Sequence, residues 1–248
     1  MSHAYLTYLR RVYDLVEDIL ATQAHAVETA ADWMADAIAK PGVVHLFGSG
    51  HSHMVAEEVF HRAGSLLPLN PMLDANLTLL GSVSATLLER TPGYGKVIVG
   101  SHDIRNGEVV IVASNSGVNP VPIEVALCSK ERGARTIAIT SDAHYRNAPS
   151  RHKSGMRLAE VADLVIDTRV PKGDALVSIP GVEVPAGGAS SVVGVTVINA
   201  VVVEAAARLA ARGVKPPLIP TMNLPGGDAE MEQLIAAWGD RLPLLRHA

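Results

Sequence analysis

One stretch near the start of the chain, residues 43–64, constrains the fold more than any other. An apolar run, residues 43–47, leads through a GSGHS segment at residues 48–52 into a sequence with helical spacing. This order is typical of a β-strand, a glycine-rich turn and the start of a helix. The turn can hold an anion, because glycine admits a ligand close to the backbone and the first helical N–H groups attract negative charge. A tight βα turn also needs glycine for steric reasons. This stretch alone therefore does not decide between an anion-binding turn and a turn that is only structural.

Composition and charge narrow the class of protein. The chain has 248 residues, of which 48% are hydrophobic and 19% charged, and its net charge is −4. It offers no basic surface, so we expect no nucleic-acid partner. The single cysteine, Cys128, excludes an internal disulfide, and no basic segment followed by an apolar run opens the sequence. We therefore expect a soluble cytoplasmic protein that does not associate with membranes.

A second strand, turn and helix start begins at residue 109. Residues 109–113 are an uninterrupted apolar run, as a parallel strand buried on both faces requires. Pro120 and Pro122 suit the first turn of a following helix, where a missing N–H costs nothing. A helix N-cap needs one polar side chain, whereas this turn carries four, and we interpret the surplus as a phosphate site. The four residues are Ser114, Asn115, Ser116 and Asn119.

Strands and helices alternate along the rest of the chain. Long helical patterns occupy residues 4–40 and 189–212, and further apolar strands are predicted at residues 136–140 and 164–167. The alternation predicts an α/β fold with a doubly wound parallel sheet, whose ligands collect beyond the carboxyl ends of the strands. Both serine-containing turns lie at such ends. We expect a helical extension over residues 1–40, a ligand-binding domain over 41–212, and a tail with a short helix over 213–248.

Three segments together resemble the signatures of the sugar isomerase (SIS) domain family. They read VVHLFGSGHS at residues 43–52, IVASNSG at 111–117 and TIAITS at 136–141. The resemblance covers roughly residues 40–212, and the long first helix is similar to that of the phosphoheptose isomerase branch. With LPGGD at residues 224–228, the whole pattern looks most like an uncharacterised group of SIS proteins labelled phosphosugar isomerases. The resemblance implies a three-layer αβα fold of flavodoxin type, a sugar phosphate ligand and a role in carbohydrate metabolism.

The resemblance also assigns the polar residues of the two turns. Asn119 stands where phosphoheptose isomerase has serine, and an amide can still donate a hydrogen bond to phosphate. The residues expected to hold the phosphate are Ser52, Ser114, Ser116 and Asn119, and those expected beside the sugar are Ser49 and Asn115.

The catalytic residues of phosphoheptose isomerase do not carry over. Its histidine and glutamate on the first helix fall at Glu58 and Arg62, and its late histidine falls at Asn199. We therefore expect neither its zinc site nor its acid/base pair, and we predict no metal and no cofactor. His53, Glu57 and His61 share one helix face, but eight residues span about 12 Å, too far for three ligands to meet one ion easily.

The remaining candidates for chemistry are two carboxylates and two histidines. Aldose–ketose isomerisation moves a proton between adjacent carbons through an enediol and needs a carboxylate base. Glu204 lies in an apolar helical segment, where a carboxylate is costly unless it is functional or paired, for example with Arg62. Glu58 follows the serines of the first turn closely and could face the sugar. The alternative is that Glu58 is a solvated helix residue without a role in chemistry. His61 or His152 would assist a ring or carbonyl oxygen, although a loop histidine such as His152 is commonly exposed.

These observations predict an aldose–ketose isomerase acting on a phosphorylated sugar. A second hypothesis is a non-catalytic phosphosugar sensor, which needs the serine turns but no base. A third hypothesis is a lyase acting on an amino-sugar phosphate. Sensors usually carry a DNA-binding module, and the sequence shows no basic helix-turn-helix segment, which favours the enzyme. The long first helix and the nearly uncharged late helix predict a homodimer, or a homotetramer built from dimers.

Overall fold

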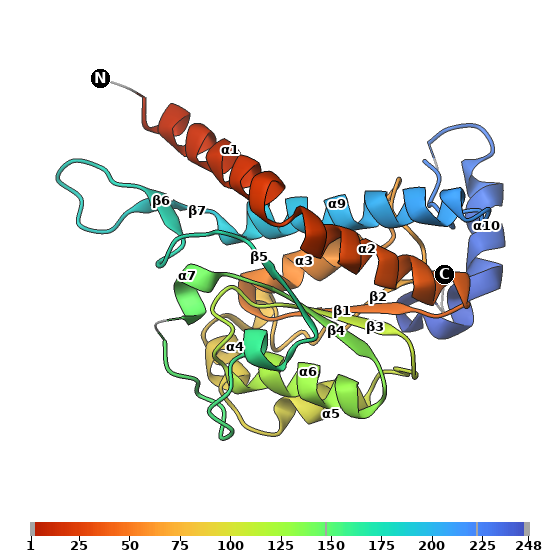
Figure 1. Ribbon diagram of the computed structural model, residues 1–248, viewed down its shortest axis with the longest axis horizontal. Helices are drawn as coiled ribbons and strands as arrows, with labels where there is room; N and C mark the ends of the chain where they lie inside the picture. The colour runs from red at the N-terminus through yellow and green to blue at the C-terminus, as the bar shows by residue number, and fades with distance from the viewer. Residues whose placement is uncertain (1–2, 147, 222, 246–248) are drawn as a thin grey trace.

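A five-stranded sheet forms the centre of the computed structural model, which describes residues 3–146, 148–221 and 223–245. The strands are β1 (Val44–Gly48), β2 (Leu69–Pro71), β3 (Val109–Ala113), β4 (Arg135–Thr140) and β5 (Leu164–Asp167). All neighbouring strands are parallel, and their order across the sheet is β2-β1-β3-β4-β5 (Figure 1). The prediction of a doubly wound parallel sheet is confirmed.

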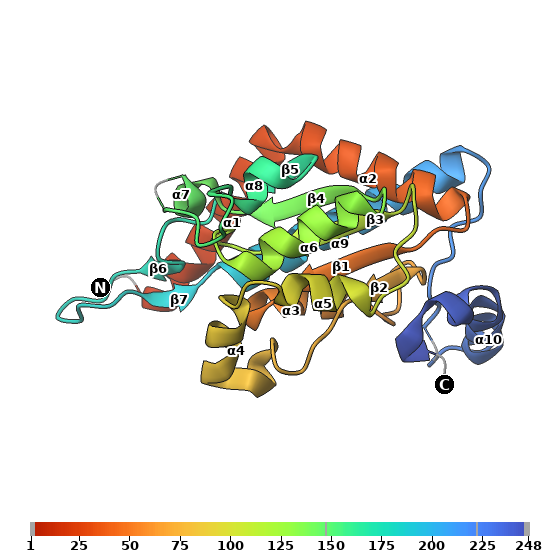
Figure 2. The same cartoon turned by 90° about the horizontal axis from the view of Figure 1, so that it is seen from below.

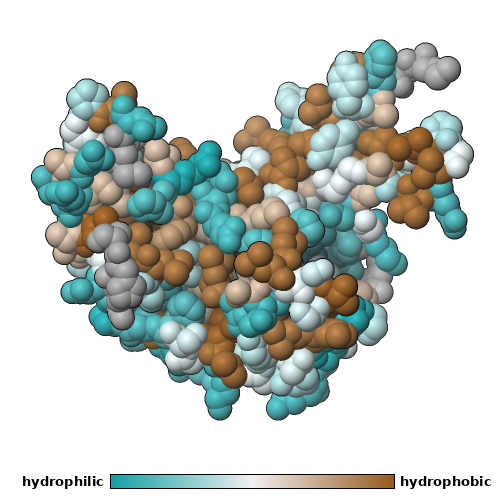
Figure 3. Space-filling model, turned by 180° about the vertical axis from the view of Figure 1, so that it is seen from behind, coloured by the Kyte–Doolittle hydropathy of each residue, from teal (hydrophilic) through white to brown (hydrophobic). Residues whose placement is uncertain are grey.

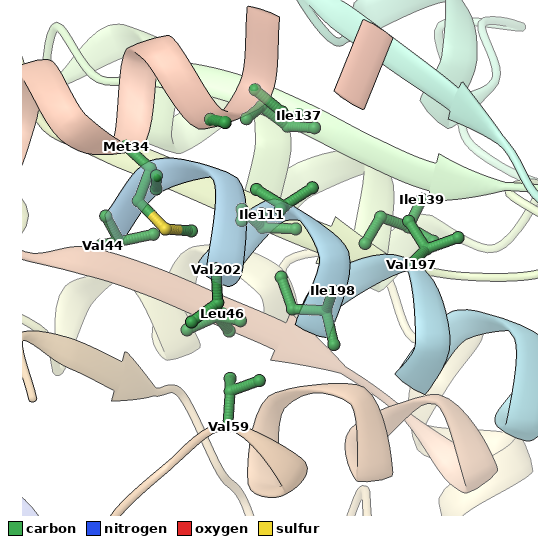
Figure 4. Close-up of a cluster of buried hydrophobic side chains, with 14 of the residues drawn as sticks. Met34, Val44, Leu46, Val59, Ile111, Ile137, Ile139, Val197, Ile198 and Val202 are labelled. Carbon is green, nitrogen blue, oxygen red and sulfur yellow. The ribbon is translucent and has the colours of Figure 1, made fainter. Parts of the chain in front are cut away.

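Helices cover both faces of the sheet and produce three layers (Figure 2). The helices of one face are α2 (Ala24–Ala39), α3 (His53–Glu58) and α9 (Ser190–Ala211), and those of the other are α5 (Tyr94–Gly100), α6 (Pro120–Glu131) and α8 (Leu158–Val161). Every residue of β1 and β3 is buried, as their apolar composition requires between two helical layers. Figure 4 shows the larger core, in which Met34, Ile111 and Val202 meet between α2, β3 and α9.

Helix α9 has a composition that resembles that of a membrane span. Among the described helices it is the one long and apolar enough to cross a membrane, and 44% of its apolar window is buried inside the fold. Val197, Ile198 and Val201 on its inner face belong to the core against the sheet. The buried face accounts for part of the apolar composition of α9, since Val192 and Val203 are exposed.

The predicted helix over residues 4–40 is two helices. The long N-terminal helix is present as α1 (Ala4–Thr22), and α2 follows after a break at Gln23. The side chain of Gln23 accepts a hydrogen bond of 3.0 Å from the Asp167 amide at the end of β5. Neither glycine nor proline marks the break, and this tertiary contact joins it to the end of β5. While α1 projects from the body, α2 packs in the main core (Figure 1).

The segment between β5 and α9 contains a small antiparallel hairpin, which projects beside α1 (Figure 1). Two of its residues, Val182 and Val184, are exposed at its tip. The remaining short elements are β6 (Ala175–Val177), β7 (Ala186–Gly188), α4 (Ser82–Glu89), α7 (Asp142–Tyr145), α10 (Gly227–Trp238), and the 3-10 turns η1 (Gly50–Ser52), η2 (Leu79–Gly81), η3 (Gly239–Arg241) and η4 (Pro243–Leu245).

A buried charged cluster lies at the amino ends of β1 and β3, centred on Glu108. His45 lies 3.1 Å from one carboxylate oxygen of Glu108, and Arg241 donates to the other at 2.8 Å. The amides of Val43 and Arg105 donate to the same carboxylate at 2.9 and 2.8 Å. Burial raises the pKa of Glu108, but the hydrogen bonds from these four residues outweigh it and lower that pKa to about 2. The cluster ties the C-terminal segment to the sheet.

Candidate functional site

The two serine-containing turns meet at the carboxyl edge of the sheet. Gly48 at the end of β1 pairs in register with Ala113 at the end of β3, so the turns that follow are neighbours. The strand order reverses at this point, because β2 lies on one side of β1 and β3 on the other. Open α/β sheets bind ligands in the crevice at such a switch point. The fold therefore places the predicted anion-binding turns where a ligand crevice is expected.

The turn after β1 is shaped by its glycines. A side chain on Gly48 would place a Cβ atom 2.2 Å from the Ser52 carbonyl oxygen, and Gly50 has a φ of +53°, which favours glycine. The Ser52 amide donates to the Ser49 carbonyl at 3.1 Å and closes the turn. Within the described residues the Ser52 hydroxyl has no hydrogen-bond partner, and this half-exposed group is free to contact a ligand.

Ser49 is held by a residue that the sequence did not reveal. Its side chain is buried, and its hydroxyl donates to a carboxylate oxygen of Glu89 on α4 at 2.9 Å. Glu89 lines a cavity of about 380 Å³ together with His51 and Thr78. Nothing in the periodicity of residues 79–89 marks Glu89, since the contact joins segments 40 residues apart. The expected place of Ser49 beside the sugar stays a prediction.

The turn after β3 holds two serines and an asparagine. Ser114 is 5% exposed, and its oxygen accepts a hydrogen bond from the Gly117 amide at 3.2 Å, which leaves the hydroxyl proton free to donate. The hydroxyl of half-buried Ser116 has no partner among the described residues. The amide oxygen of Asn115 is buried and, within the same residues, also lacks a hydrogen-bond donor. A ligand that both donates and accepts hydrogen bonds would satisfy this turn.

Asn119 stands at the N-cap of α6 but does not cap it with its side chain. The side chain is 7% exposed, and its oxygen accepts a hydrogen bond of 2.7 Å from the Arg151 guanidinium. The Arg151 amide donates to the Val118 carbonyl at 2.8 Å, so the loop after α7 is tied to the turn after β3. The sequence marks Arg151 only as one of several basic residues in that loop. The contact with Asn119 connects it to the site.

Glu58 and His61 come together at one cavity. Glu58 is the last residue of α3, six residues after Ser52, which corresponds to about 9 Å along the helix axis. Its carboxylate lies 3.2 Å from the Arg62 guanidinium, and its side chain is 25% exposed. His61 is exposed and has a φ of +49°. Glu58, His61 and Arg62 line a cavity of about 530 Å³ between α3 and α9.

Glu204 is not brought to the serine turns. It lies fourteen residues after Ser190, about 21 Å from the start of α9. Its carboxylate accepts a hydrogen bond of 2.8 Å from Arg208, one helical turn later, and not from Arg62. The side chain is 42% exposed, so the expected burial on an apolar helix face is wrong. Arg208 also contacts Asp32 on α2, and the pair forms part of the contact between α9 and α2.

The candidate histidines do not lie together in one site. His152 is buried, not exposed, and its ring lies 2.8 Å from the Ser154 hydroxyl and 3.9 Å from the Glu124 carboxylate. His53 lies 3.4 Å from Glu57. Among the described residues, no three side chains of histidine, cysteine, aspartate or glutamate gather where a metal ion could bind. Within the same part of the chain, neither His152 nor His61 is hydrogen-bonded to the six polar residues of the turns.

Comparison with protein families matches residues 7–141 to the SIS domain. The chain is 41% identical over 239 residues to the UPF0309 protein of Geobacillus kaustophilus, covering 96% of this chain and 95% of that protein. It is 38% identical over 239 residues to a UPF0309 protein of Listeria innocua, covering 96% and 97%.

Three solved structures share the fold at low identity. The sugar isomerase domain of an RpiR transcription factor from Sphaerobacter thermophilus has a TM-score of 0.54 at 17% identity, over 93% of this chain and 97% of that one. Phosphoheptose isomerase GmhA from Neisseria gonorrhoeae has a TM-score of 0.54 at 16% identity, over 82% and 97%. A phosphoheptose isomerase from Francisella tularensis has a TM-score of 0.51 at 14% identity, over 81% and 95%. These likenesses establish the three-layer fold.

Proposed function

Since this chain belongs to the SIS domain family, we propose that it binds a phosphorylated sugar in the crevice between the turns after β1 and β3. One observation carries the proposal: two neighbouring turns offer hydrogen-bond donors that no other described residue uses. The donors proposed for the phosphate are the side chains of Ser52, Ser114, Ser116 and Asn119, and the residues proposed for the sugar are Ser49 and Asn115. The N-terminal end of α6, which carries the positive end of the helix dipole, adds to the attraction for an anion.

We also propose that the protein is an isomerase that interconverts an aldose and a ketose phosphate through an enediol. The reaction needs a carboxylate base and a donor to the carbonyl oxygen. Glu58 and His61 support this role because they line one cavity, although among the described residues that line it none belongs to the serine turns. Glu58 ends α3, about 9 Å along the helix axis from Ser52. Glu204 has weaker support, since it pairs with Arg208 far along α9. His152, the remaining candidate, is tied to Ser154.

Two other functions would use the same phosphate site. The likeness to the sugar isomerase domain of a transcription factor suits a phosphosugar sensor, which needs no base. A lyase acting on an amino-sugar phosphate needs a base but transfers its proton differently. A sensor predicts binding without exchange of a carbon-bound hydrogen. A lyase also removes a carbon-bound proton and can exchange it with solvent, but it does not interconvert an aldose and a ketose.

Thermal stabilisation by a panel of pentose, hexose, heptose and amino-sugar phosphates tests binding first. We expect at least one member to stabilise the wild type, and its C1 or C2 hydrogen to exchange with deuterated water, as followed by NMR. Glu58→Gln should keep binding and slow exchange about 10²–10⁴-fold, the usual loss for a general base. Glu204→Gln is the matched control and should exchange at the wild-type rate.

The outcomes separate the candidate functions. If no phosphosugar stabilises the wild type, the binding proposal fails. If a ligand binds tightly but none exchanges, the isomerase fails and the sensor replaces it. If a hydrogen exchanges but no aldose–ketose conversion follows, the lyase replaces it. If Glu204→Gln is slow and Glu58→Gln is not, the roles of the two carboxylates are reversed.

We propose that the protein assembles as a homodimer or as a tetramer of dimers, with its sites near the subunit boundaries. An apolar groove of about 330 Å³ runs between α1, α2 and α9, and Figure 3 shows apolar residues exposed on the projecting part of the molecule. Leu9, Tyr13 and Leu20 on α1 are more than half exposed, which a partner subunit would cover.

Sedimentation tests this assembly. The wild type should sediment as a dimer or tetramer at micromolar concentration, and Leu20→Glu should shift it towards smaller species. Val83→Glu, at an equally exposed apolar residue on α4, is the control and should not change the sedimentation. A stable wild-type monomer would contradict the proposal.

We further propose a cytoplasmic location and a role in carbohydrate metabolism. The absence of an internal disulfide, with one cysteine in the chain, is compatible with a reducing compartment. The net charge of −4 supports a small anionic ligand held by local donors and not a nucleic acid.

A further inference from the structure

The turns proposed to hold the phosphate contain no lysine or arginine, and the side chains proposed as donors are neutral. A sugar phosphate carries about −1.5 to −2 charges near neutral pH. Helix α6 supplies fewer N–H groups than most helix N-termini, because Pro120 and Pro122 occupy two positions of its first turn. The whole chain is also acidic, with a net charge of −4. A lysine or arginine for the phosphate must therefore come from outside the two turns.

Arg151 is placed to provide this charge. Its guanidinium donates to the side-chain oxygen of Asn119, at 2.7 Å, where the turn after β3 becomes α6. The other arginines of the same loop, Arg146 and Arg157, pair with Asp142 and Glu160. Within the described residues Arg151 forms no ion pair with a carboxylate. Its charge is therefore free for a ligand.

The same contact sets the direction of the Asn119 amide. An amide has an acceptor oxygen at one end and a donor NH₂ at the other. Because Arg151 occupies the oxygen, the NH₂ group remains as the end that can reach an anion. The side chain of Asn119 is 7% exposed, so the surrounding chain restricts it to few orientations. A serine at this position would need no such partner, since one hydroxyl both donates and accepts.

We propose that Arg151 is a phosphate-binding residue, which contacts the ligand's phosphate through its guanidinium and positions Asn119 so that the amide N–H groups face the same phosphate. The inference rests on the proposed function and adds the charge that the two turns lack. A guanidinium presents several N–H donors in a planar fork that matches phosphate oxygens. The ligand class follows: a dianionic phosphate monoester, preferred over a neutral sugar of the same size.

Isothermal titration of wild type and Arg151→Gln tests the direct contact. The probes are inorganic phosphate and the sugar phosphate that stabilises the wild type most, at fixed salt and about pH 7.5, where phosphate is mainly dianionic. Arg151→Gln should weaken both ligands about 10–100-fold, the weight of one charged hydrogen bond. The affinity of Arg151→Lys should lie between those of the wild type and Arg151→Gln, because lysine keeps the charge but lacks the planar set of N–H donors.

Two comparisons distinguish this role from a general effect of charge or folding. Lys153→Gln removes an exposed cation of the same loop and should leave both affinities unchanged. The melting temperature of Arg151→Gln without ligand should stay close to that of the wild type, because Arg151 is an exposed residue. Equal losses in Lys153→Gln and Arg151→Gln, or no loss in Arg151→Gln, would overturn the proposal.

The positioning role has its own test. In an Asn119→Ser background, Arg151→Gln should weaken phosphate binding less than it does in the wild type, since a hydroxyl needs no fixed orientation. The same fold-loss in both backgrounds would overturn the positioning of Asn119. A wild type that binds neither probe would instead refute the proposed function, which is visible before any variant is made.

Discussion

Replacing Ser114 and Ser116 together by alanine is expected to weaken phosphosugar binding by about 3–6 kcal/mol. Each hydroxyl is free to donate to the phosphate, and a hydrogen bond to a charged group contributes about 1.5–3 kcal/mol. The fold should change little, because within the described residues the two substitutions remove a single hydrogen bond, from the Gly117 amide to Ser114. Calorimetric titration of the best phosphosugar, at fixed salt, measures the loss of affinity.

A buried serine outside the site provides the matched control for this double variant. Ser129 lies on α6 with 0% exposure, and its hydroxyl has no partner among the described residues. Ser129→Ala should therefore leave ligand affinity unchanged. An unaltered affinity in Ser114→Ala/Ser116→Ala would remove the basis for placing the phosphate between these turns.

Replacing Glu108 by alanine is expected to lower the free energy of unfolding by about 3–5 kcal/mol. The carboxylate is buried, with the residue 3% exposed, and its removal takes the acceptor from His45 Nε2 and leaves Arg241 with only its contacts to Asp103 among those of the cluster. Breaking a buried ion pair from one side costs this much because the remaining group keeps its desolvation penalty. Urea unfolding followed by circular dichroism measures the change, and Glu131→Ala, at an exposed glutamate on α6, should change it little.

The pH dependence of stability gives a second measure of the same cluster. The pKa of Glu108 is lowered to about 2, so its contribution is complete above an ordinary pKa of 4.5 and is lost as the pH falls towards 2. Burial, together with His45 and Arg132 nearby, lowers the pKa of His102 from 6.5 to about 4. Between these two pH values the unfolded chain binds a proton that the folded chain does not, so the free energy of unfolding decreases as the pH falls. Stability should therefore fall on acidification through both windows. A Glu108→Ala variant that keeps the wild-type slope below pH 4.5 would contradict the assignment.

The sequence predicts the parts of this fold that depend on local patterns. The apolar runs of β1 and β3 and the glycines after β1 carry their own signals, because a buried strand and a positive φ each restrict the residue types allowed. The SIS resemblance, confirmed by the family match, depends on the same segments. Where residues near one another in the chain decide the structure, the prediction succeeds.

Contacts between distant segments account for the features that sequence patterns did not predict. The break at Gln23 coincides with a hydrogen bond to a residue 144 positions away, and Arg151 contacts Asn119 across 32 positions. Neither contact leaves a periodic signal. The assumption of burial for Glu204 failed for a related reason, because Arg208 and Asp32 become its surroundings only when α2 and α9 pack together.

The tie between Arg241 and Glu108 has a consequence for how the chain folds while it is being made. The two residues are separated by 133 positions, so the carboxylate emerges from the ribosome long before its guanidinium. At about 5–20 residues per second, translation leaves Glu108 without that partner for roughly 7–27 s. The delay is longer for Val43 and Leu67, because the apolar cluster that buries them includes Leu242. Any sheet that forms before residue 241 is made therefore lacks this cover at its amino ends, and the apolar surface left there is one that a chaperone can bind.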